Sequence, residues 1–107
     1  MFYLNNTFSR NINSWNTVAV TNMTQMFDQA SPFNQNLNSW NTGSVTSMVN
    51  MLNNAILFDQ NLAAWNVSSC VNISQMFYGA SSFNQNLSNW NVINVTNVAN
   101  MFYSKLF

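Results

Sequence analysis

The sequence predicts a repeat solenoid in which each 25-residue coil contributes a short parallel strand and a short helix or helical turn. Three observations support this prediction. The chain repeats with a fixed period, it is rich in apolar and aromatic residues, and the spacing of its apolar residues changes within each unit. A unit of this length is too small to bury its own apolar side, whereas stacked units bury a continuous core.

The period is 25 residues along the whole chain, without insertion or deletion. Four complete units span 1–25, 26–50, 51–75 and 76–100, and a partial fifth spans 101–107. We therefore expect one domain of 1–107 that is an excerpt of a longer array. Four positions of the unit, 8, 11, 15 and 16, hold the same residue in every copy: Phe8, Phe33, Phe58 and Phe83; Asn11, Asn36, Asn61 and Asn86; Trp15, Trp40, Trp65 and Trp90; Asn16, Asn41, Asn66 and Asn91.

The strand is expected at positions 15–17 of each unit. Trp65 and Val67 are two residues apart and can point to one face, with Asn66 on the other. The helix is expected further along, because Val45, Met48, Met51/Leu52 and Ala55 follow a helical spacing, with Ser44 as a suitable N-cap.

Equivalent residues of successive coils should stack about 4.8 Å apart if the coils pair as parallel strands. The phenylalanines of position 8 and the tryptophans of position 15 would then form two aromatic rows in the core. Their buried apolar area would supply most of the stability.

The composition excludes several functional classes. Only Arg10, Asp28, Asp59 and Lys105 are charged and the net charge is zero, so the clustered cations that bind nucleic acid are absent. No apolar run approaches the roughly 20 residues of a membrane span. Histidine is absent and the two aspartates occupy different positions of the unit, so we expect no catalytic site, no metal site and no cofactor.

One long phrase, Phe-Asn-Gln-x-Leu-x-x-Trp-x-x-x-x-Val-Thr-x-Met-x-x-Met-Phe-x-x-Ala, carries a resemblance to a known family. Residues 33–55 and 83–102 show it most clearly. It resembles the BspA-like leucine-rich-repeat surface proteins, especially the 25-residue repeat of mycoplasma lipoproteins. The resemblance implies a leucine-rich-repeat-like solenoid, extracellular or cell-surface display, and adhesion or protein interaction without enzyme activity. The family commonly has Asp where this chain has Asn at positions 11 and 16, which places any cation-binding row in doubt.

The two asparagine rows have different expected roles. The Asn16 row should face outward from the strand, either as a hydrogen-bonded ladder along the stack or as a stripe of ligand contacts. The Asn11 row should satisfy backbone groups at the turn into the strand. If a binding surface exists, the variable neighbours Asn38-Ser39, Ala63-Ala64 and Ser88-Asn89 are better candidates than the repeated residues. Six sequons could carry glycans: Asn5, Asn22, Asn66, Asn72, Asn86 and Asn94.

Two functions remain open at this point. The first is a non-enzymatic surface module that binds a protein or a glycan. The second is a structural protomer that associates end to end into a filament or surface layer, because the chain starts and stops in phase with the repeat and its low charge opposes self-association little.

Overall fold

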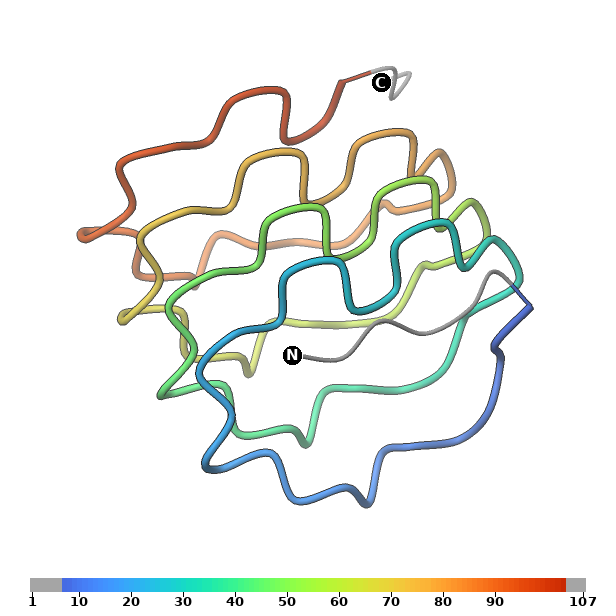
Figure 1. The fold of residues 1–107 in the computed structure, drawn as a ribbon, viewed down its shortest axis with the longest axis horizontal. Coiled ribbons are helices and arrows are strands. Elements are labelled where there is room, and N and C mark those ends of the chain that lie inside the picture. Colours follow the sequence, from blue (N-terminus) through green and yellow to red (C-terminus); the bar gives the residue numbers. More distant parts are fainter. Residues whose placement is uncertain (1–6, 104–107) are drawn as a thin grey trace.

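The computed structural model describes residues 7–103, and none of these residues lies in a helix or in a strand of a sheet. Their β pairing consists of three isolated parallel bridges, which join Asn22 to Ser47, Ser47 to Asn72, and Asn72 to Asn97. Bridged residues are 25 apart, so equivalent positions of successive units lie side by side. Figure 1 shows the units following one another from blue to red through a compact body of 31 × 30 × 22 Å.

Each unit is built from successive β-turns rather than from regular elements. The Met51 N–H donates to Met48 O at 3.2 Å, and the Asn53 N–H donates to Asn50 O at 3.3 Å. Each bond joins residues three apart in the chain, as in a β-turn. Asn50 and Asn54 have left-handed backbones, with φ of 56° and 57°. The same conformation recurs at positions 25 and 4 of the other units, in Gln25, Gln75 and Asn100, and in Gln29 and Gly79.

The units are joined by backbone hydrogen bonds from alternate residues. The Met48 N–H donates to Asn72 O at 3.0 Å and the Asn50 N–H to Ser74 O at 3.1 Å, each one unit further along. Positions 2 and 4 of the unit donate in the same direction. These amides therefore satisfy their hydrogen-bonding capacity across the body and not along the chain.

The predicted helix is wrong. Val45, Met48, Met51 and Ala55 are fully buried, as a helical stripe would be, but the chain between them turns repeatedly. A left-handed residue at position 25 interrupts any right-handed helix, and the amides that a helix would use internally are bonded to the next unit.

The predicted strand at positions 15–17 is also wrong. Trp40 and Thr42 are buried and Asn41 is exposed, but no backbone ladder forms there. The Trp40 and Trp65 rings stack with an interplanar angle of 1° and centroids 6.5 Å apart. The Thr42 hydroxyl donates to Asn66 O at 2.9 Å, so a side chain makes the hydrogen bond between units at this position.

These findings correct the predicted fold class. The described residues form a compact body of turns, and not a strand-plus-helix solenoid of the leucine-rich-repeat type. The expectation of a filament protomer also lacks support, since it assumed that solenoid. Within residues 7–103 there is no helix of the length and apolar character that a membrane crossing requires.

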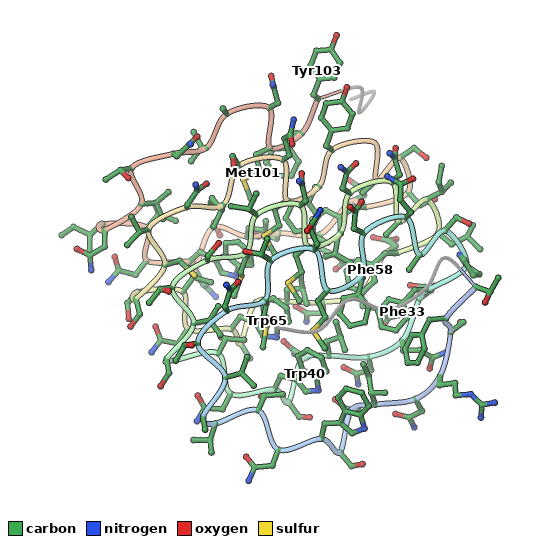
Figure 2. All side chains as sticks on the ribbon, viewed as in Figure 1. Phe33, Trp40, Phe58, Trp65, Met101 and Tyr103 are labelled. Carbon is green, nitrogen blue, oxygen red and sulfur yellow. The ribbon has the colours of Figure 1, made fainter. Side chains whose placement is uncertain are left out.

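The core is aromatic and lies between the turns. Phe33, Phe58 and Phe83 stack with centroids 5.9 and 6.0 Å apart, and Phe8 joins them at 5.8 Å while remaining partly exposed. Figure 2 shows Phe33 next to Phe58 and Trp40 next to Trp65 in the interior. Trp15 lies at the end of its row and is 39% exposed, whereas Trp40 and Trp65 are 3% and Trp90 8% exposed.

Candidate interaction surface

Both asparagine rows of the sequence analysis are exposed and form the same local motif. In the Asn11 row and the Asn16 row alike, each side-chain Oδ1 accepts a hydrogen bond from the backbone N–H two residues later, at 2.8–3.2 Å. This is an Asx turn, which asparagine forms readily because its short side chain reaches that amide. The Oδ1 atoms thus order the turns that follow, and do not bond from one asparagine of a row to the next.

Each asparagine introduces a β-turn whose two central residues vary between units. After Asn36, the Trp40 N–H donates to Leu37 O at 3.1 Å, so Asn38 and Ser39 form the tip of that turn. A second turn follows Asn41 in the same way. We call these tips the turn-tip surface: residues 13–14, 38–39, 63–64 and 88–89 in one row, and 18–19, 43–44, 68–69 and 93–94 in the other.

Hydrogen bonds between units hold the tips at a regular separation. The Ser39 hydroxyl donates to Asn13 O at 2.9 Å, and the Ala64 N–H donates to Asn38 Oδ1 at 3.2 Å. In the second row, the Ser69 hydroxyl donates to Gly43 O at 2.8 Å. The turn-tip surface is therefore an ordered array and not a set of independent loops.

Another polar row, separate from the two asparagine rows, runs along positions 9 and 10 of the unit. The Asp59 N–H donates to Asn34 Oδ1 at 2.9 Å, and Asp59 Oδ1 in turn accepts from the Asn84 N–H and from Gln85 Nε2, both at 2.9 Å. Sequence reasoning considered Asp59 only as a catalytic acid and missed this row. The signal was available in the pairs Asn-Gln and Asp-Gln that follow Phe33, Phe58 and Phe83.

The ionisable groups are used structurally. Asp28 is buried, and its carboxylate accepts hydrogen bonds from Gln29 Nε2 at 3.1 Å and from Gln25 Nε2 at 3.5 Å. Burial raises the pKa of the Cys70 thiol to about 11, and its Sγ lies 3.2 Å from Val45 O. Among residues 7–103 no three His, Cys, Asp or Glu side chains lie together in a way that could hold a metal ion.

The sequons differ in their placement. Asn22, Asn66, Asn86 and Asn94 are exposed and Asn72 is half-buried, while Asn5 lies outside the described residues. The Oδ1 atoms of Asn22 and Asn72 also form Asx turns, with Thr24 and Ser74. Asn94 instead donates through Nδ2 to Ser68 O at 2.7 Å.

Comparison with known proteins gives one family. The model of a family described as "Mycoplasma protein of unknown function, DUF285" matches residues 1–106. The chain matches no curated protein and no solved structure.

Proposed function

We propose that this chain, which belongs to the DUF285 family of mycoplasma proteins of unknown function, is a non-enzymatic module displayed at the cell surface for adhesion or protein interaction. The proposal rests on one observation: within the repeat unit, invariant and variable residues occupy different places in the structure. Invariant residues form the core or introduce turns, whereas the turn-tip surface consists of variable residues that are exposed or half-buried. A scaffold of this kind can change its partner without changing its fold.

The chemistry of the turn-tip surface indicates the class of partner. Its members are uncharged: most are small side chains such as Ser44 and Ala64, and Val18 and Ile93 add exposed apolar side chains. Recognition would then depend on hydrogen bonds and shape and not on electrostatic attraction. A protein or a glycan surface fits this description, and a nucleic acid does not, because phosphate binding needs cations.

The resemblance to BspA-like surface proteins supports the same assignment. It favours an extracellular or cell-surface location and a binding role. The absence of histidine from the sequence, together with the structural use of both aspartates, argues against acid–base catalysis.

The binding role is tested with the purified chain on arrayed glycans and immobilised extracellular-matrix proteins. A Ser44→Arg/Ala64→Arg variant places two bulky cations on the turn-tip surface, where neither side chain makes a hydrogen bond to lose. We expect it to weaken binding by at least about tenfold, because a clash and an unpaired charge oppose docking. A Leu57→Arg variant is the control, since Leu57 is 53% exposed but lies outside the turn tips.

Equal binding by the wild type and the turn-tip variant would overturn the assignment of the surface, and equal loss in the Leu57 variant would show that the effect is nonspecific. The location is tested separately, by adding protease to intact cells of the source organism. Cleavage before lysis supports surface display, and protection until lysis contradicts it.

A further inference from the structure

Position 3 of the repeat unit carries side chains that differ in size from one unit to the next. Among the described residues it holds Asp28, Asn53, Tyr78 and Tyr103. The rings of Tyr78 and Tyr103 stack with centroids 5.0 Å apart and an interplanar angle of 14°. Figure 2 shows Tyr103 projecting from the edge of the body. The repeat fold does not require a tyrosine here, because Asn53 occupies the same position in another unit.

The ring of Tyr78 forms a step on the surface. One face of the ring packs against Tyr103. The other face is turned toward unit 51–75, where position 3 holds Asn53, and an asparagine side chain ends where the ring of a tyrosine begins. Tyr78 and Asn53 are both half-buried, so the outer part of this ring face stands clear of the neighbouring unit. The face lies between two described units and is therefore independent of whatever precedes or follows them.

Side chains at positions 25 and 4 of the unit lie beside position 3. In an earlier unit, Gln25 Nε2 and Gln29 Nε2 both donate to the Asp28 carboxylate, at 3.5 and 3.1 Å. Next to Tyr78, position 25 is Gln75 and position 4 is Gly79. Gly79 has no side chain, and a Cβ there would collide with Asn54 Oδ1. The amide of Asn54 therefore occupies the space beside the tyrosine ring that a side chain at position 79 would take.

The amides around the ring have hydrogen-bonding groups without partners among the described residues. The side chains of Gln75 and Asn54 are both half-buried and make no hydrogen bond to a described residue. Asn53 Nδ2 donates to Asn50 Oδ1 at 3.4 Å, but Asn53 Oδ1 is buried and accepts no hydrogen bond. A buried acceptor without a donor is costly and rare, which indicates a place where a donor is missing. We call Tyr78, Asn53, Asn54 and Gln75 the Tyr78 step.

The chemistry of the Tyr78 step selects a class of ligand. The face of an aromatic ring is electron-rich and attracts the C–H groups on the apolar face of a pyranose. Side-chain amides both donate and accept, so they match the hydroxyl groups at the edge of the same sugar. An apolar side chain of a protein partner would cover the ring but leave these amides unpaired. None of the four residues is charged, so an anionic ligand has no counter-ion here.

We propose that the Tyr78 step binds a neutral glycan. One sugar ring stacks on the face of Tyr78 that is turned toward Asn53, and its hydroxyls form hydrogen bonds with the amides of Gln75 and Asn54. A small rotation of the half-buried Asn53 side chain brings its Oδ1 to a sugar hydroxyl, which supplies the missing donor. Tyr103 holds the Tyr78 ring in place from behind. The step contains none of the turn-tip residues, so this site is additional to the proposed binding role of the turn tips.

An array of neutral and sialylated glycans, probed with the labelled intact chain, tests the proposal. We expect the chain to bind at least one neutral glycan. Tyr78→Ala should weaken this binding by at least about tenfold, because it removes the stacking face, whereas Tyr78→Phe keeps the ring and should bind within about threefold of the wild type. Gln75→Leu keeps the size of the side chain but loses its polar groups, and should weaken binding by at least about threefold.

The Ser44→Arg/Ala64→Arg variant is the control, because it changes the turn-tip surface and leaves the Tyr78 step intact. It should bind the neutral glycan as the wild type does. Thermal melting of each variant confirms that it is folded. Three results would overturn the proposal: no binding to any neutral glycan, equal binding by the wild type and the folded Tyr78→Ala variant, and binding through Tyr78 to immobilised proteins alone. Glycan binding lost only in the control variant would support the turn tips and contradict the step.

Discussion

Replacing Trp65 with alanine gives the most informative single test of the aromatic core. Its ring is 3% exposed, stacks on Trp40 and Trp90 with centroids 6.5 Å away on either side, and donates from Nε1 to Leu37 O at 2.9 Å. Removing a buried tryptophan costs about 3–5 kcal/mol, and each aromatic pair accounts for about 0.5–1.5 kcal/mol beyond buried area. We therefore expect Trp65→Ala to lower the free energy of unfolding by about 4 kcal/mol.

Two further variants separate the contributions to this loss. Trp65→Phe keeps a ring but loses the Nε1 hydrogen bond, and should cost about 1–2 kcal/mol. Leu37 O would still accept the Trp40 N–H at 3.1 Å, so no acceptor is left unsatisfied. Trp15→Ala should cost about half as much as Trp65→Ala, because Trp15 is 39% exposed and its ring removes less apolar area from water.

Urea unfolding followed by circular dichroism measures all three values from the transition midpoint and slope. A loss below about 1 kcal/mol for Trp65→Ala would refute the burial of this row. An equal loss for Trp15→Ala and Trp65→Ala would refute the argument that the cost follows the buried area of the ring.

Three other predictions concern the turns and the buried thiol. Gly79→Ala should cost about 1–3 kcal/mol by thermal melting, because Gly79 has φ of 70° and a Cβ there would collide with the Asn54 side chain. Gly43→Ala should cost less, because Gly43 does not have a left-handed backbone. Asn50→Gly should keep or slightly raise stability and Asn50→Val should lower it by about 1–2 kcal/mol, since a β-branched residue tolerates a left-handed backbone poorly. The pKa of Cys70 rises on folding from 9.0 to about 11, so the folded state holds the thiol proton more tightly than the unfolded state. The free energy of unfolding should therefore be highest below pH 9 and fall between pH 9 and about 11. A Cys70→Val variant should lose this pH dependence.

The sequence predicted which side chains are buried better than it predicted how the backbone runs. Val45, Met48, Met51 and Ala55 are all fully buried, and so are most members of the phenylalanine and tryptophan rows. A spacing of three or four residues reports only which positions face the core. Successive turns bury the same positions as a helix would, so the pattern could not distinguish them.

The hydrogen-bond partners of the backbone could not be predicted from one unit. A helix cannot form there, because the amides at positions 23, 25, 2 and 4 donate to backbone carbonyls 24 residues further along the chain. The local signal for this arrangement was weak. Asn50 and Gly79 are residues that tolerate a left-handed backbone, but Gln25 and Gln75 adopt the same conformation without any strong preference for it.

The candidate surface was only partly visible in the sequence. The pairs Asn38-Ser39 and Ala63-Ala64 were recognised as variable, and the structure places them at the tips of ordered turns. The second row of tips was not anticipated, because Ser44, at position 19 of its unit, was interpreted as the N-cap of a helix. The chain turns after each member of the Asn16 row, and this turn places residues 18–19 and their equivalents on the surface.

Backbone nuclear magnetic resonance over residues 45–55 tests the central claim, that units built from turns are joined by hydrogen bonds between equivalent positions. We predict Cα shifts of left-handed residues at Asn50 and Asn54, and slow hydrogen exchange for the Met48 and Asn50 amides, which donate to Asn72 and Ser74. An unbroken run of helical Cα shifts over the same residues would contradict the account.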